Sequence, residues 1–143
     1  MPHGSSKSVS SNGLSTIWLA AALRVTGDVV SGTEILPARA DEANANLREA
    51  GLADDGHVVP GHTRATISTI TEPIDLVFID AEKDDDSAQF EVVFVEVRCG
   101  GLILADNVVS HDCSVYQAML RSRSDVDTMT LPIEHGIEFT YKR

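Results

Sequence analysis

The chain has 143 residues, a hydrophobic content of 43% and a formal net charge of −11, from 11 Lys and Arg against 22 Asp and Glu. This composition predicts one globular domain with its own core. The negative charge argues against nucleic acid or an anionic membrane as the main partner. The sequence shows no membrane-spanning run and no signal-peptide pattern. With Cys99 and Cys113 expected to be reduced thiols, the predicted location is cytoplasmic.

Residues 1–13 are small and polar, and they are expected to form a disordered or degenerate segment. Val9 is the one candidate there for a strand residue. The pattern changes at Ser15, which can cap a helix, and strong helix formers follow it. Residues 14–143 are therefore expected to form a single α/β domain.

Helical and strand patterns alternate along this domain. The expected helices lie at 15–27, 37–51, 63–70, 85–98 and 114–123, and the expected strands at 29–34, 57–60, 76–79 and 102–105. This alternation predicts an α/β sandwich with a mostly parallel sheet. Two alternating runs at 126–131 and 137–141, joined by a turn with glycine, predict an antiparallel hairpin at the sheet edge.

Apolar spacing predicts which face of each helix is buried. The helix at 85–98 would bury Phe90, Val93, Phe94 and Val97, although its β-branched content would also allow a strand. The other expected buried stripes are Ala40, Ala43, Leu47 and Ala50 in the helix at 37–51, and Val115, Ala118 and Met119 in the helix at 114–123.

The strand that usually occupies the centre of such a sheet has no apolar run ahead of Ser15, so it is expected to be missing or degenerate. A core without its central strand leaves strand edges and apolar faces uncovered. Pairing with a second copy would cover them, so a homodimer or a higher oligomer is expected.

Polar residues follow two of the buried strands. Asp80 ends one apolar run, and Asp106 and Asn107 end the next. Ligands and catalytic groups collect at the carboxyl ends of parallel strands. Two carboxylates and an amide oxygen are hard ligands, which suit Mg²⁺, Ca²⁺ or Mn²⁺. The alternative is that both aspartates cap turns.

Several segments, in their order and spacing, resemble a known family. They are SNGLSTIWLA, ANLREAGL, DLVFIDAEK, GGLILADN and the closing hairpin. Over about residues 12–143 the chain resembles the class I S-adenosylmethionine-dependent O-methyltransferases of the bacterial, caffeoyl-CoA and catechol type, N-terminally truncated. The resemblance implies a Rossmann-like methyltransferase sandwich whose last two strands form the antiparallel hairpin.

The resemblance also implies where S-adenosylmethionine would bind. Asn12, Gly13 and Ser15 match the end of the glycine-rich cofactor loop, where amides at a helix start approach the methionine carboxylate. Glu34 matches the acidic residue that accepts hydrogen bonds from the ribose hydroxyls. Asp80 is also expected at the cofactor.

The same resemblance implies roles in catalysis. Asp80, Asp106 and Asn107 match the metal ligands of metal-dependent members. Lys83 matches the lysine proposed as general base, and the alternative is that Lys83 only pairs with the aspartates that follow it. Ser110-His111-Asp112 is not a triad, because consecutive residues rarely orient on one another as a triad requires.

Two functions follow as hypotheses. The first is transfer of a methyl group from S-adenosylmethionine to a hydroxyl of a small aromatic molecule, with a divalent cation assisting the reaction. The second is a catalytically inactive methyltransferase-like fold that acts as an oligomeric or interaction module. Lys7, Val9 and His62 depart from the family pattern around the cofactor and favour the second hypothesis.

Overall fold

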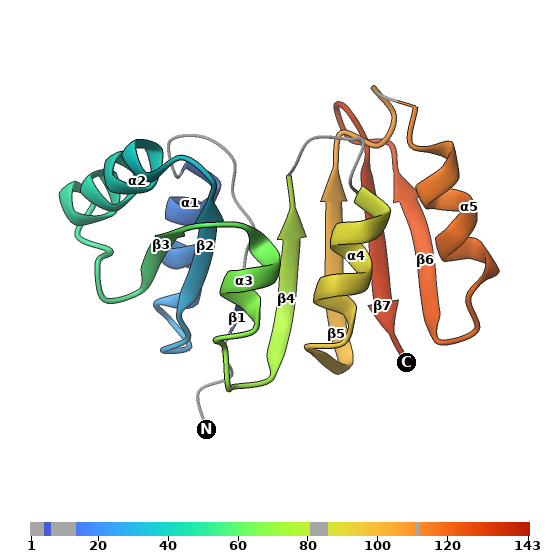
Figure 1. Ribbon diagram of the computed structural model, residues 1–143, viewed down its shortest axis with the longest axis horizontal. Helices are drawn as coiled ribbons and strands as arrows, with labels where there is room; N and C mark the ends of the chain where they lie inside the picture. The colour runs from blue at the N-terminus through green and yellow to red at the C-terminus, as the bar shows by residue number, and fades with distance from the viewer. Residues whose placement is uncertain (1–4, 7–13, 81–85, 111) are drawn as a thin grey trace.

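The computed structural model of the chain describes residues 5–6, 14–80, 86–110 and 112–143 (Figure 1). The helices there are α1 (Leu14–Leu23), α2 (Pro37–Glu49), α3 (Thr63–Ile67), α4 (Asp86–Phe94) and α5 (Ser114–Ser122). The strands there are β1 (Ser5–Ser6), β2 (Val30–Glu34), β3 (Gly56–Pro60), β4 (Ile74–Ile79), β5 (Val97–Asp106), β6 (Val126–Leu131) and β7 (Ile137–Lys142). None of these helices is long and apolar enough to cross a membrane.

The strands form two hydrogen-bonded groups. In the order β1-β2-β3 all pairings are parallel, while the order β4-β5-β7-β6 contains one parallel pairing and then two antiparallel ones. Strand β1 contacts β4, which brings the two groups together at the centre. Figure 1 shows α3 and α4 in front of the strands and α1 behind β2. This arrangement confirms the predicted α/β fold, with a mostly parallel sheet and a C-terminal antiparallel hairpin.

The first strand is reduced to two residues. Ser5 pairs with Val30 and Ser6 pairs with Ser31. The prediction of a degenerate first strand is therefore confirmed, and the candidate Val9 lies outside the described residues. Two serines carry no hydrophobic signal, and their strand exists because β2 supplies the pairing partner.

Two separate clusters of buried side chains form the core. One lies under α1 and α2 against β2 and β3, and it contains Ala20, Val30, Ala40, Ala43, Leu47, Leu52 and Val58. The other lies between α3, α4, α5 and the strands β4 to β6, and it includes Ile74, Val77, Phe90, Val93, Ile103, Tyr116 and Leu120.

The helix predicted at 85–98 is too long. Helix α4 ends at Phe94, and Val97 opens β5 by pairing with Ile74. The four apolar residues predicted to be buried are all buried, but Val97 is buried in the sheet. The glycines at 100 and 101 lie inside β5, where the register with β4 shifts, and Gly100 takes a φ of 83°. A glycine tolerates that left-handed backbone, and the β-branched Val97 suits a strand.

Other helix details also differ from the predictions. Ser15 is not a cap, because α1 begins at Leu14. Ala50 is exposed beyond the end of α2, and α3 ends at Ile67. Helix α5 buries Tyr116 and Leu120, while the predicted Val115 is 78% exposed. Tyr116 packs edge-on against Phe90 with ring centroids 5.9 Å apart, and this tertiary contact sets the rotation of α5.

A buried carboxylate joins the hairpin to α5. Glu138 on β7 is completely buried, and it accepts hydrogen bonds from the hydroxyls of Thr128 at 2.8 Å and Thr130 at 2.6 Å. From α5, Gln117 Nε2 donates to the same carboxylate at 3.1 Å, and an Arg121 nitrogen lies 3.7 Å from it. Several donors therefore compensate the burial of one negative charge.

We expect Glu138→Ala to lower the free energy of unfolding by about 3 kcal/mol, because it leaves buried donors without an acceptor. Glu138→Gln keeps the shape and one acceptor oxygen, so the loss should be smaller. Urea unfolding followed by circular dichroism measures both effects. The matched control is Glu134→Ala, in the exposed turn between the same two strands. Equal unfolding midpoints for Glu138→Ala and Glu134→Ala would contradict the prediction.

Candidate functional site

Three strands bring acidic residues to one edge of the fold. Glu34 is the last residue of β2, Asp106 is the last residue of β5, and Asp80 follows β4 directly. In Figure 1, β4 and β5 point the same way, and the chain passes from β2 into α2 at the same edge. The candidate site thus lies outside the carboxyl ends of parallel strands, beside the junction of the two strand groups.

Glu34 is held firmly at this edge. Glu34 is only 8% exposed, and its Oε1 atom accepts a hydrogen bond from the Leu36 amide at 3.0 Å. Its carbonyl oxygen accepts from the Gly61 amide at 2.8 Å. A carboxylate can accept several hydrogen bonds at once.

Thr33 is a neighbour that the sequence pattern did not single out. It is buried beside Glu34, and its hydroxyl lies 3.2 Å from the hydroxyl of Thr63, the first residue of α3. This contact ties the end of β2 to α3. The signal in the sequence was the polar Thr33-Glu34 pair at the end of a buried strand, but only the fold shows that Thr63 is its partner.

Asp80, Asp106 and Asn107 lie together, as predicted from the two strand ends. The side-chain amide of Asn107 donates to Asp80 Oδ1 at 3.4 Å, and the backbone amide of Asn107 donates to Asp106 Oδ1 at 2.7 Å. All three residues are half-buried. Asn107 has a φ of 62°, a left-handed conformation that asparagine tolerates better than most residues.

The chemistry of this donor set fits a hard divalent cation. The oxygens of two carboxylates and an amide are the ligands that Mg²⁺, Ca²⁺ and Mn²⁺ prefer. Asn107 turns its Nδ2 toward Asp80. A half-turn of the side-chain amide would present Oδ1 to a cation shared with that carboxylate. Among the described residues no three His, Cys, Asp or Glu side chains form a metal cluster, so the third ligand here would be the amide.

The loop after Asn107 leads to α5. The Asp112 Oδ1 atom accepts a hydrogen bond from the Ser114 amide at 3.2 Å at the start of that helix. Hydrogen bonds from the Ser114 side chain and backbone lower the pKa of Asp112 below its usual value. Asp112 is therefore a carboxylate engaged with the helix start.

The remaining predicted site residues are not all described. Asn12, Gly13 and Lys83 lie outside the described residues. Ser15 is the second residue of α1 and is half-buried. The candidate site that the structure describes therefore consists of Glu34, Asp80, Asp106 and Asn107.

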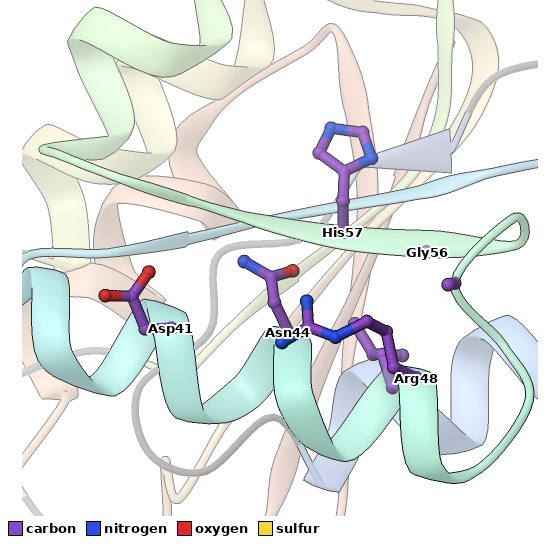
Figure 2. Close-up of a pocket in the computed structure, with 7 residues that line it drawn as sticks. Asp41, Asn44, Arg48, Gly56 and His57 are labelled. Carbon is purple, nitrogen blue, oxygen red and sulfur yellow. The ribbon is translucent and has the colours of Figure 1, made fainter.

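A hollow of about 470 Å³ lies elsewhere, between α2 and β3 (Figure 2). Asp41, Asn44, Arg48 and His57 are among the residues that line it. The side chain of Asn44 pairs with the backbone of Val58 at the outer edge of β3. Its Nδ2 atom donates to the Val58 carbonyl at 2.7 Å, and its Oδ1 atom accepts from the Val58 backbone amide at 2.8 Å. An edge strand satisfied in this way is poorly suited to pairing with another chain. None of the predicted site residues that the structure describes lines this hollow.

Comparison with known proteins places the chain in a family. A model described as a methyltransferase domain matches residues 10–108. A catechol O-methyltransferase from Mycobacterium tuberculosis (strain ATCC 25618 / H37Rv) is 42% identical over 98 residues, which cover 68% of this chain and 44% of that protein. The chain thus spans less than half the length of this relative.

Solved structures agree with the fold. An O-methyltransferase from Bacillus cereus in complex with SAH has a TM-score of 0.88 at 25% identity, covering 99% of this chain and 74% of that one. The O-methyltransferase TomG from Streptomyces achromogenes, in complex with SAM, has a TM-score of 0.86 at 26% identity, covering 98% and 73%. With residues 10–108 matched by the family model, the chain belongs to the methyltransferase domain family.

Proposed function

We propose that this chain is the catalytic domain of an S-adenosylmethionine-dependent O-methyltransferase that acts on a hydroxyl of a small, aromatic molecule with the help of a divalent cation. The observation that carries the proposal is that Asp80, Asp106 and Asn107 contact one another through hydrogen bonds of Asn107. They lie at the same edge of the fold as Glu34, the last residue of β2. The relative from M. tuberculosis is named a catechol O-methyltransferase, which supports a substrate with adjacent hydroxyls.

Glu34 is the proposed cofactor ligand on the β2 side. A buried carboxylate that already accepts a backbone hydrogen bond is fixed in orientation, so it can receive ribose hydroxyls without further ordering. The bound SAH and SAM named for the two solved relatives support this kind of ligand. Asn12, Gly13 and Ser15 are proposed to approach the methionine carboxylate at the start of α1.

Asp80, Asp106 and Asn107 are the proposed cation ligands. A divalent cation at this position supplies Lewis acidity, which lowers the pKa of a hydroxyl that binds to it. Asp106 and Asp80 hold the negative charge that attracts the cation, and the amide of Asn107 completes the set of oxygens. Asp80 is also a proposed contact of the cofactor.

Lys83 is the proposed general base. It removes the proton from the substrate hydroxyl, and the resulting oxygen attacks the methyl carbon of the sulfonium in line. A carbon–oxygen bond forms as the carbon–sulfur bond breaks, and the sulfur keeps the electron pair. The products are a methyl ether and S-adenosylhomocysteine, with the proton on Lys83. Positioning of the two substrates supplies much of the rate acceleration.

A second function, an oligomeric or interaction module, is supported by a different feature. One side of α1 and the turn after it present an apolar stripe, in which Leu14 is 63% exposed, Trp18 71% and Val25 90%. Leu14 and Trp18, four residues apart, lie on one face of α1, and Val25 lies in the turn that follows the helix. An exposed stripe of this kind is typical of an interaction surface. A second copy of the chain is the proposed partner, in keeping with the expected homodimer.

The cofactor proposal predicts that Glu34→Gln weakens binding of S-adenosylmethionine by about tenfold or more, because the ribose hydroxyls lose a charged acceptor. The variant keeps the oxygen that accepts from Leu36. Calorimetric titration of wild type and variant measures the affinity. Glu42→Gln, an exposed position on α2, is the matched control and should bind as wild type does. Equal affinity for all three proteins would sink the assignment of Glu34.

The cation proposal predicts that Asp106→Asn weakens Mn²⁺ binding by about tenfold or more, since the site loses a negative ligand. The variant keeps an oxygen that can accept from the Asn107 amide, so the local backbone should be preserved. Electron paramagnetic resonance of free Mn²⁺ gives the affinity. Asp112→Asn, an exposed carboxylate before α5, should leave it unchanged. Unaltered Mn²⁺ affinity in Asp106→Asn argues that both aspartates are only turn caps.

The association proposal predicts that the chain is a dimer at micromolar concentration and that Trp18→Glu shifts it to the monomer. A charge in the centre of a buried apolar stripe would have to be desolvated. Light scattering coupled to size exclusion measures the mass. Val115→Glu, equally exposed on α5, is the control and should remain dimeric. A wild-type monomer would contradict the proposal.

A further inference from the structure

The backbone of Asn107 adopts a conformation that is uncommon for residues other than glycine. Its φ of 62° lies in the left-handed region, which costs most residues with a side chain about 1–2 kcal/mol. A conformation of this kind persists only where the surroundings impose it. The Asn107 side chain reaches Asp80 from this backbone, so whatever fixes the backbone also fixes this contact between the residues that follow β4 and β5.

The turn between β6 and β7 supplies the constraint. The carbonyl of Gly136 accepts a hydrogen bond from the Val108 amide at 3.1 Å. The carbonyl of His135 accepts from the amides of Val109 at 2.8 Å and Ser110 at 3.2 Å. These bonds continue the β5–β7 pairing beyond its last register pair, Asp106 and Ile137. The segment directly after Asn107 is therefore attached to a turn that lies about thirty residues later in the sequence.

Gly136 allows this close approach. A Cβ atom at position 136 would clash with Cγ2 of Val109, and it would lie 2.7 Å from the Val109 Cβ and 3.0 Å from the Val109 amide nitrogen. The φ of Gly136 is 83°, which also favours glycine. Val108 is buried in the core beside this contact, so the segment cannot move away from the turn without uncovering an apolar side chain.

We infer that Gly136 is a positioning residue that sets the orientation of Asn107, and through it the geometry of the proposed cation ligands. This inference rests on the proposed function for its link to a cation, and on the structure alone for its link to Asn107. Gly136 touches neither substrate nor cofactor. It acts by letting the turn approach Val109 and hold the backbone on which Asn107 sits.

The test is Gly136→Ala, with two readouts. Without added cation, hydrogen exchange by nuclear magnetic resonance should show the Val108 and Val109 amides exchanging about tenfold faster, while amides of the β5–β7 ladder stay protected. With Mn²⁺, the affinity should fall by about tenfold or more. Gly51→Ala is the matched control, because Gly51 has a similar φ of 69° with nothing near its Cβ position. Gly51→Ala introduces a similar backbone strain but no clash with a neighbouring residue, so it should change neither amide exchange nor Mn²⁺ affinity.

A compensating variant separates positioning from general damage. Val109→Gly removes the atoms that the new Cβ would strike, so the double variant Gly136→Ala/Val109→Gly should regain the Mn²⁺ affinity and amide protection of Val109→Gly alone. Wild-type protection of Val108 and Val109 in a folded Gly136→Ala overturns the inference, whatever the cation does. If the wild type binds no Mn²⁺, the cation proposal fails, and the amide exchange still decides whether Gly136 positions Asn107.

Discussion

The antiparallel pairing of β5 with β7 is the constraint on which the candidate site depends. Strand β5 pairs with β4 on one side and β7 on the other, and it ends at Asp106. The buried carboxylate of Glu138 lies on β7 opposite Ala105, one pair before that end, and donors from α5 and β6 hold it. The hairpin thus does more than close the sheet edge. It fixes the strand that ends at Asp106 and leads into Asn107, two of the proposed cation ligands.

Much of the fold could be predicted because its signals are local. Short apolar runs ending in Asp80 and Asp106 gave the parallel strands, and the alternating runs before and after Gly136 gave the hairpin. The errors came from contacts between distant residues. Val97 joined β5 because Ile74 was there to pair with it, and α5 turned Tyr116 inward because Phe90 packs against it. Ser5 and Ser6 form a strand only because β2 accepts them.

The features of the candidate site also divide into those that the sequence could predict and those that it could not. The carboxylates at strand ends could be found from the sequence, since an acidic residue after a buried run is a visible pattern. The left-handed backbone of Asn107, the hydroxyl contact between Thr33 and Thr63, and the approach of Gly136 to Val109 could not. Each of these joins elements that are separated along the chain, so no spacing rule points to them. They position the proposed ligands, whereas the sequence alone points to the proposed ligand types.

The two separate hydrophobic clusters have a consequence for how the chain unfolds. In the described residues, Glu34 belongs to the half built on β2 and β3, while Asp80 and Asp106 belong to the half built on β4 to β7. Among the described residues, the short β1 and the small helix α3 join the two halves, so each half can open as its own cooperative unit. A molecule held by Glu34 and Asp80 together would bridge the halves and make their unfolding one event. Its binding free energy would then appear as cooperativity, and the shape of a melting curve would report occupancy of the site.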